Sequence, residues 1–300
     1  IIPLKLLNNQ NITGQIIVLE PRRLAARAAA SQMAVLLNEP VGETVGFQIK
    51  GLNKVSKQTR IVVITEGILI RMIQSDPSLS KVGCIIFDEF HERSINADLG
   101  LALSLQLAEV LRNDLKIIVM SATLDVGPVS DLLDTRAPII SEGRAYHVEC
   151  KYLSRPKSKN EDLWGNFSEL VSNAFEMTDG GILAFLPGEA EIKTTAKLLK
   201  EKLPKTAIIM PLYGSLPFDQ QFKILKPLEN KNLRKVVLST SIAETSLTIS
   251  DIKVVVDSGY TRRSLYDPSS GMSRLITQKI SKAEANQRMG RAGRITEGWC

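Results

Sequence analysis

The 300 residues suffice for about two domains of ordinary size, and 44% hydrophobic with 23% charged residues is typical of a globular protein. No apolar run approaches the ~20 residues that cross a bilayer and no signal peptide is recognisable, so we expect neither membrane spans nor secretion. Three widely separated cysteines and two histidines match no zinc or disulfide pattern, which predicts reduced thiols and a cytoplasmic protein. A net charge of +6 with 5% aromatic residues permits binding to a nucleic-acid backbone but argues against extensive base stacking.

Strands and helices alternate along the first half of the chain. The helix expected at 94–112 has leucines at alternate positions, which alone would suggest a strand, but its length and polar start favour a buried helix. Such alternation predicts a parallel sheet with helices packed against it. The elements expected are helices at 1–7, 24–37, 65–74 and 94–112, and strands at 15–20, 60–64, 82–87, 115–120 and 138–141.

The second half repeats this alternation and adds a hairpin. Residues 262–266 and 275–280 flank the turn-forming segment 267–271, which predicts two antiparallel strands. The other elements expected are strands at 147–153, 182–186, 207–212, 235–239 and 253–257, and helices at 162–177, 189–203 and 218–225. The predicted fold class is α/β with two tandem domains, 1–145 and 146–300, each built on a mostly parallel doubly wound sheet.

The strand expected at 82–87 ends in a cluster of charged residues. Asp88 and Glu89 follow it directly, with His91 close behind. In open α/β sheets, ligands bind just beyond the carboxyl ends of the strands. Two adjacent acids there can divide the work of phosphoryl transfer, with Asp88 holding a hydrated Mg²⁺ and Glu89 orienting or deprotonating a water. A solvated acidic turn is the alternative interpretation of these residues alone.

A second strand end, after residues 15–20, carries Arg22 and Arg23 at the start of an alanine-rich helix. Paired arginines at a strand-to-helix junction can bind a phosphate group with help from the helix N-terminus. Two solvated arginines that merely open the helix are equally compatible with this segment.

Four segments occur in the order of a known enzyme family: Asp88-Glu89-Phe90-His91, Ser121-Ala122-Thr123, TSIAETSLTI at 240–249 and QRMGRAGR at 287–294. Together they resemble the superfamily 2 helicases, and within these the DEAH-box group. Phe90, with LEPRRLAARAAA at 19–30, is similar to the bacterial HrpB-type ATP-dependent helicases. The resemblance covers essentially the whole chain. It implies two RecA-like domains that bind single-stranded nucleic acid and hydrolyse ATP with Mg²⁺.

The resemblance also implies roles for individual residues. Asp88 would hold Mg²⁺, Glu89 would activate the attacking water, and His91 would couple the site to the second domain. Ser121 and Thr123 would relay the state of the nucleotide to nucleic-acid binding, and Thr248 would face the ribose. The remaining assignments are Gln287 near the catalytic water, Arg291 and Arg294 as arginine fingers on the γ-phosphate, and Arg22, Arg23, Thr65, Gly188 and Thr240 as contacts to the nucleic-acid backbone.

The spacing of the last motif is compatible with its assignment. Gln287, Arg291 and Arg294 are separated by four and three residues, so we expect them to share one face of a helix. Arginines at the equatorial oxygens of a transferred phosphoryl group stabilise the charge there, and fingers from a second domain would tie hydrolysis to domain movement.

The chain departs from the family pattern at several positions. The phosphate-binding loop that ends in Gly-Lys-Thr or Gly-Lys-Ser is absent and would fall just before Ile1, so we expect no ATP hydrolysis from this chain alone. The loop normally follows a central strand, and the loss of that strand is expected to leave a gap inside the first sheet. Relative to the family pattern, the chain also stops early at its C-terminal end. Gln32 and Leu225 replace the Arg and Phe that often sandwich the base, which predicts loose nucleotide choice.

The sequence therefore predicts the core of an ATP-dependent RNA helicase or translocase that moves on single-stranded nucleic acid. RNA as the substrate rests on the family resemblance alone, because none of the residues named above reads a 2′-hydroxyl. Two alternatives stay open. One is a DNA translocase of the same superfamily, and the other is a nucleic-acid-binding fragment without catalysis.

Overall fold

The computed structural model describes residues 1–122, 126–133, 138–141, 146–153, 162–244, 249–294 and 296–300. The chain divides into two compact units, Ile1–Ser141 and Glu142–Cys300. The boundary expected from the sequence, between residues 145 and 146, lies four residues further along. Within the described residues, no helix combines the length and the apolar character that a bilayer-spanning segment requires.

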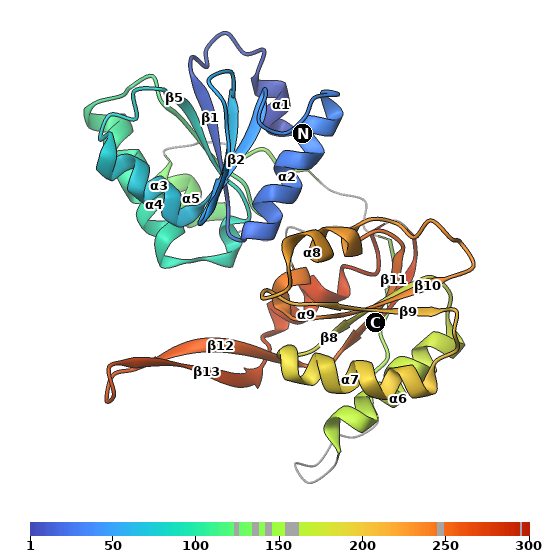
Figure 1. Ribbon diagram of the computed structural model, residues 1–300. Helices are drawn as coiled ribbons and strands as arrows, with labels where there is room; N and C mark the ends of the chain where they lie inside the picture. Colours follow the sequence, from blue (N-terminus) through green and yellow to red (C-terminus); the bar gives the residue numbers. More distant parts are fainter. Residues whose placement is uncertain (123–125, 134–137, 142–145, 154–161, 245–248, 295) are drawn as a thin grey trace. The chain divides into compact units, whose positions relative to one another are not determined.

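The first unit is a sheet with helices on both faces (Figure 1). Its strands are β1 (Gln15–Glu20), β2 (Val45–Ile49), β3 (Leu52–Lys54), β4 (Ile61–Thr65), β5 (Val82–Phe87) and β6 (Lys116–Val119). Its helices are α1 (Ile2–Leu6), α2 (Arg23–Leu36), α3 (Glu66–Ser75), α4 (Ile95–Val110), α5 (Val126–Leu132) and the short 3₁₀ helix η1 (Phe90–Glu92). The strand order is β3-β2-β4-β1-β5-β6, and all neighbours are parallel except β2 and β3.

Two apolar layers cover the first sheet because neighbouring side chains of a strand point to opposite faces. On one face, Ile17 and Phe87 pack with buried residues of α3 and α4. On the other face, Ile16 and Ile86 pack with buried residues of α2. Every residue of β5 is buried, as expected for a central parallel strand. The strand that ends at Asp88 is therefore held rigidly from both sides.

The second unit is also a parallel sheet between helices (Figure 1). Its strands are β7 (Val148–Glu149), β8 (Gly181–Phe185), β9 (Ala207–Leu212), β10 (Arg234–Ser239), β11 (Ile252–Asp257) and β14 (Gly298–Trp299). Its helices are α6 (Leu163–Met177), α7 (Glu189–Lys202), α8 (Phe218–Leu225), α9 (Lys282–Met289) and the 3₁₀ helix η2 (Ser241–Ala243). The order is β7-β14-β11-β8-β10-β9, with α6 and α7 packed on the face formed by residues such as Ile182 and Val236.

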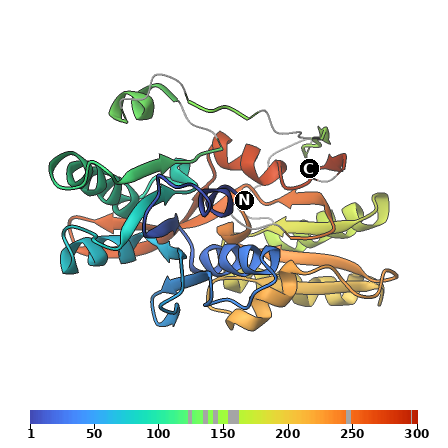
Figure 2. The ribbon, with the colours of Figure 1, turned by 90° about the horizontal axis from the view of Figure 1, so that it is seen from above.

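A hairpin of two further strands, β12 (Tyr260–Asp267) and β13 (Met272–Lys279), extends away from the second sheet (Figures 1 and 2). The strands are antiparallel, as the sequence predicts. The side chain of Asp267 accepts hydrogen bonds from the Ser269 main-chain N–H and from the hydroxyls of Ser269 and Ser270. These bonds lower the pKa of the Asp267 carboxyl and close the turn.

The predicted fold class is confirmed, although one predicted strand is wrong and two strands were not predicted. The sequence interpretation assigned no element to residues 45–54, which form β2 and β3. A Cβ at Gly46 would lie 2.4 Å from the main-chain oxygen of Lys54, so glycine is needed where the two strands approach closely. Residues 138–141 form no strand and are exposed.

The expected gap in the first sheet is also absent. The described strands pair without interruption from β3 to β6, so any further strand of this sheet would attach at an edge. Ile117, Ile118 and Val119 of β6 are only partly buried, in contrast to the fully buried β5.

Candidate catalytic and nucleic-acid-binding sites

The residues predicted in the first unit gather at one edge of its sheet. Strands β4, β1, β5 and β6 are neighbours and parallel, so their carboxyl ends lie side by side. Thr65 ends β4, Arg22 follows β1, Asp88 follows β5 and Ser121 follows β6. Segments that are far apart in sequence therefore meet where α/β sheets bind ligands.

Asp88 is fixed by its main chain at this edge. Its N–H donates to the Leu19 oxygen at 3.1 Å, and its Oδ1 accepts from the Glu89 N–H at 2.8 Å. Burial raises the pKa of the Asp88 carboxyl, and the neighbouring Glu89 carboxylate raises it further, against the lowering effects of that hydrogen bond, the chain's amino group and His91. A bound cation would favour the ionised carboxylate, so the environment suits a metal ligand.

Glu89 and His91 form a pair beside Asp88. Glu89 has a left-handed backbone (φ 51°), which turns the chain sharply between β5 and η1. The Nε2 atom of His91 lies 3.4 Å from Glu89 Oε2, and its Nδ1 lies 3.4 Å from the N–H of Ala122. His91 thus connects the Asp88–His91 segment to the segment that follows β6. Both contacts lie within the first unit.

Arg22 has a partner that the sequence interpretation missed. Its Nη2 lies 3.1 Å from Oε2 of Glu92, and both side chains are largely buried, while Arg23 is exposed. Glu92 belongs to the same charged run as Asp88, but a sequence alone does not show which arginine meets it. The ion pair links the end of β1 to η1 and orients Arg22 at the edge.

Gly188 and Thr240 lie at the carboxyl edge of the second sheet, after the parallel strands β8 and β10. Gly188 caps α7 at its N-terminus, and a Cβ there would meet the Arg262 guanidinium at 2.5 Å. Arg262 is in turn paired with Glu191 at 2.8 Å. The Oγ1 of Thr240 accepts from the Ile242 N–H at 3.5 Å and begins η2.

The expectation that Gln287, Arg291 and Arg294 share one helical face is wrong. Helix α9 ends at Met289, and residues 290–294 form a turn. Arg291 is buried, and its Nη2 donates to the main-chain oxygen of Glu244, whereas Arg294 is exposed. Gly290 and Gly293 could have indicated from the sequence that the helix ends before them, because glycine disfavours a helix interior.

Two predicted residues, Thr123 and Thr248, lie outside the described residues. Their assigned roles stay predictions.

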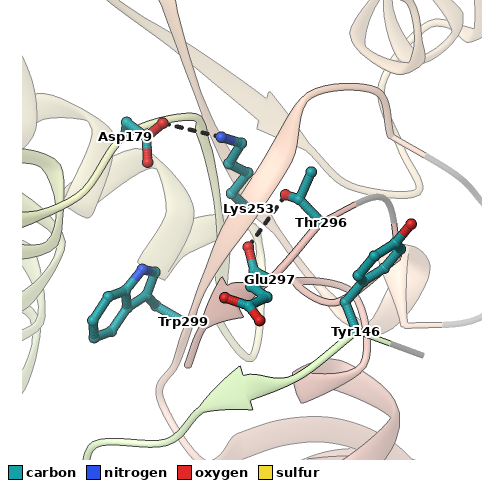
Figure 3. A pocket seen from close by; sticks show the side chains of 6 residues that line it. All are labelled: Tyr146, Asp179, Lys253, Thr296, Glu297 and Trp299. Atoms are coloured by element: carbon teal, nitrogen blue, oxygen red, sulfur yellow. Dashed lines mark hydrogen bonds and ion pairs between the residues drawn. The ribbon is translucent and has the colours of Figure 1, made fainter.

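One pocket of the second unit contains none of the predicted residues, whereas another is lined in part by Arg291 and Arg294. The first of these has a volume of about 480 Å³ and is lined by Tyr146, Asp179, Lys253, Thr296, Glu297 and Trp299. These residues lie at the amino ends of β8, β11, β14 and β7, opposite the edge that carries Gly188 and Thr240. Lys253 pairs with Asp179 at 3.0 Å, and Trp299 and Tyr146 flank Glu297 (Figure 3). The chemistry is therefore not expected in this pocket.

The described residues contain no group of three or more histidine, cysteine, aspartate or glutamate side chains arranged to hold a metal. This does not conflict with Mg²⁺ at Asp88, because Mg²⁺ is usually held by one or two carboxylates together with waters and substrate phosphates. The half-buried Asp88 carboxyl, at the carboxyl edge of the parallel sheet, can supply one such oxygen ligand when it is ionised.

The family models account for both units. The DEAD/DEAH box helicase model matches residues 1–132, and the helicase conserved C-terminal domain model matches residues 165–296. The chain thus belongs to the DEAH-box helicases of superfamily 2, and its two sheets are those of tandem RecA-like domains.

Among individual proteins, the chain is similar to ATP-dependent RNA helicase HrpB of Escherichia coli (strain K12), with 46% identity over 99% of this chain and 36% of the relative. It is 40% identical to the ATP-dependent RNA helicase HrpA homolog of Haemophilus influenzae, over 94% of this chain and 21% of that protein. A crystal structure of the E. coli DEAH/RHA helicase HrpB superposes with a TM-score of 0.92 at 47% identity, covering 99% of this chain and 38% of that one. The chain spans about a third of the HrpB length.

Proposed function

We propose that this chain is the core of an ATP-dependent RNA helicase and that it acts within a longer protein in which a phosphate-binding loop precedes Ile1. The observation that carries the proposal is the meeting of Asp88, Glu89, His91 and Ser121 at the carboxyl edge of a parallel sheet. The relatives named above are ATP-dependent RNA helicases, which supports both ATP and RNA.

In this proposal the first unit supplies the metal ligand and the base. Asp88 would hold Mg²⁺, which would supply positive charge to the phosphates when bound, and Glu89 would orient or deprotonate the attacking water. The charge of the chain's amino group lowers the pKa of Asp88, so the start of the described chain lies near this carboxyl.

The other predicted residues share the remaining work. From the second unit, Arg291 and Arg294 stabilise the charge on the transferred phosphoryl group, Gln287 orients the water and Thr248 faces the ribose. Ser121 and Thr123 couple the nucleotide state to nucleic-acid binding. Arg22, Arg23, Thr65, Gly188 and Thr240 contact the backbone of a single strand, in an interaction that phosphate charge dominates.

The test uses the chain extended at Ile1 by a phosphate-binding loop and its strand. We expect ATP hydrolysis that single-stranded RNA stimulates more than DNA. Glu89→Gln should abolish turnover and keep Mg·ATP bound, while the exposed Glu109→Gln on α4 serves as the control. Arg291→Ala or Arg294→Ala should lower kcat by roughly 10³-fold or more, the scale of arginine-finger removal. Near-normal turnover of Glu89→Gln would overturn the proposal.

The two alternatives give different results in the same experiment. Stronger stimulation by DNA than by RNA homopolymers would indicate a DNA translocase. Binding of nucleic acid without hydrolysis, even with the loop present, would indicate a binding module. The 300 residues alone should hydrolyse no ATP, because they lack the loop that holds the phosphates. The free thiols of Cys84, Cys150 and Cys300 are compatible with the proposed cytoplasmic location.

A further inference from the structure

Arg288 is the largest fully buried side chain among the described residues, with 1% of its surface exposed. It lies between the predicted site residues Gln287 and Arg291, in the last turn of α9. A guanidinium is almost never buried to this extent unless its charge and its donors are paired. Its partners therefore indicate what it holds in place.

The partners of Arg288 come from three separate segments of the second unit. Its Nε donates to Glu244 Oε2 at 3.2 Å, and its Nη1 donates to Asp257 Oδ1 at 2.9 Å and to the Tyr260 oxygen at 3.2 Å. Its Cζ also lies 4.8 Å from the centre of the Phe185 ring. Asp257 and Phe185 are register partners on β11 and β8, so Arg288 is anchored to the carboxyl ends of two neighbouring strands.

Glu244 connects this anchor to Arg291. Its carboxylate binds Arg288, and its main-chain oxygen accepts from Nη2 of Arg291. The turn after α9 is closed by hydrogen bonds from the Arg291 N–H to the Arg288 oxygen and from the Ala292 N–H to the Met289 oxygen, both 3.0 Å. The main chain of Arg291 is therefore bonded to that of Arg288, and its side chain is bonded to Glu244, whose carboxylate Arg288 holds.

We propose that Arg288 is a positioning residue for hydrolysis, which fixes Glu244 and the turn that carries Arg291 at the carboxyl edge of the second sheet. The proposal rests on the proposed function, because the position of Arg291 matters only if Arg291 stabilises the transferred phosphoryl group. Displacement of a group that acts in the transition state lowers kcat and leaves substrate binding nearly unchanged.

Lysine should not replace this arginine. The planar guanidinium reaches both carboxylates while it lies over the Phe185 ring, whereas an ammonium is a single point of charge. A misplacement of about 1 Å can cost roughly 10²-fold in rate. We therefore expect Arg288→Lys, in the chain extended by a phosphate-binding loop, to lower kcat by about 10- to 100-fold on that scale, with KM nearly unchanged.

Arg234 provides a matched control in the same unit. It is a partly buried arginine whose Nη1 donates to the oxygens of Phe175 and Thr178, and its Cζ lies 4.4 Å from the centre of the Phe175 ring. However, it lies at the amino end of β10, opposite the edge that carries Thr240. Arg234→Lys should disturb packing to a similar degree and leave kcat unchanged.

Amide exchange gives a readout that does not depend on hydrolysis. Arg288→Lys should speed exchange at Arg291 and Ala292, and Arg234→Lys should not. If Arg288→Lys fails to fold, the triple variant Arg288→Met with Glu244→Gln and Asp257→Asn removes the buried charges together. It should fold, exchange fast at both amides and remain impaired in kcat.

Two results would overturn the inference: unchanged exchange at residues 291 and 292 in a folded variant, or equal loss of kcat in Arg288→Lys and Arg234→Lys. Absence of ATP hydrolysis in the extended wild-type chain would instead refute the proposed function. The exchange comparison would then still decide whether Arg288 holds the turn.

Discussion

Arg112→Met is expected to destabilise the first unit by about 3 kcal/mol. Arg112 follows α4, and its guanidinium donates to the main-chain oxygens of Ser78 at 3.0 Å and of Leu79 and Val82 at 2.9 Å. These oxygens lie at or just before the start of β5, the strand that ends at Asp88. Methionine retains the unbranched apolar stem of the side chain but is shorter and supplies no donor.

The magnitude follows from the burial of these contacts. The Arg112 side chain is 16% exposed, and a hydrogen bond to a charged group contributes about 1.5–3 kcal/mol when it is buried. Water reaches the freed oxygens in part, so we take about 1 kcal/mol for each of the three bonds. The ion pair with Asp114, whose side chain is 59% exposed, adds little because surface pairs contribute only about 0–1 kcal/mol.

The assay is native-state hydrogen exchange over β1 and β5 in increasing urea, because a chain of two units does not unfold in one step. Arg93→Met is the control. That side chain is 61% exposed and pairs with Asp98 at 2.9 Å, so its loss should cost less than about 1 kcal/mol. A cost for Arg112→Met below about 1 kcal/mol, or one equal to the control, would refute the reasoning.

Three further predictions concern the carboxylate, the thiols and the nucleotide. Burial raises the pKa of Asp88, so its contribution to stability is present at low pH and is lost as the pH rises through the folded-state pKa; Asp88→Asn should therefore unfold at a higher temperature than wild type at pH 7 but not at pH 3. Cys300 and Cys150 lie opposite each other, because the Cys300 N–H donates to the Glu149 oxygen and the Cys300 oxygen accepts from the Lys151 N–H. Neighbouring strands lie about 4.8 Å apart, so the oxidant diamide should join these two cysteines in a disulfide. Peptide mapping should then show that the buried Cys84 remains a free thiol. If Gln32 and Leu225 face the base, as the family resemblance implies, they supply no arginine or aromatic stacking. The loop-extended chain should then use GTP, CTP and UTP within roughly tenfold of ATP, and a hundredfold preference for ATP in competition assays would contradict this.

The sequence predicts the central strands well because their signals are local. Residues 82–87 form an uninterrupted apolar run, and they become the fully buried β5. The failures occur where long-range contacts decide the structure. Gly46 lies in a strand that pairs with β4 and approaches Lys54 closely, and residues 138–141 have a strand-like composition but no partner strand among the described residues.

The placement of the first unit's site follows from the alternation of strands and helices, because parallel strands bring their carboxyl ends to one edge. The pairings within that edge do not follow. The contact of Arg22 with Glu92 spans 70 residues, and that of Ala122 with His91 spans 31. Such contacts depend on strand order, which neither spacing nor composition reveals. Pattern can thus place charged groups at one edge without showing which of them pair.

The turn at residues 290–294, which carries Arg291 and Arg294, also shows that sequence spacing does not reveal side-chain contacts. Spacings of four and three residues indicate a shared face only if the segment is helical, and here the helix ends at Met289. Gly293 packs against the chain before β7, where a Cβ would lie 2.6 Å from the Tyr146 oxygen. The segment therefore leaves α9 as a close-packed turn, and a turn cannot orient its side chains through a helical hydrogen-bond ladder. Contacts outside the turn must set the direction of Arg291, and one of them is the Glu244 oxygen, whose residue is held in turn by Arg288. Glu244, from the segment 240–249, and Arg288 and Arg291, from the segment 287–294, are thus bonded into one unit. This accounts for a buried guanidinium at Arg288, next to the proposed site residues Gln287 and Arg291.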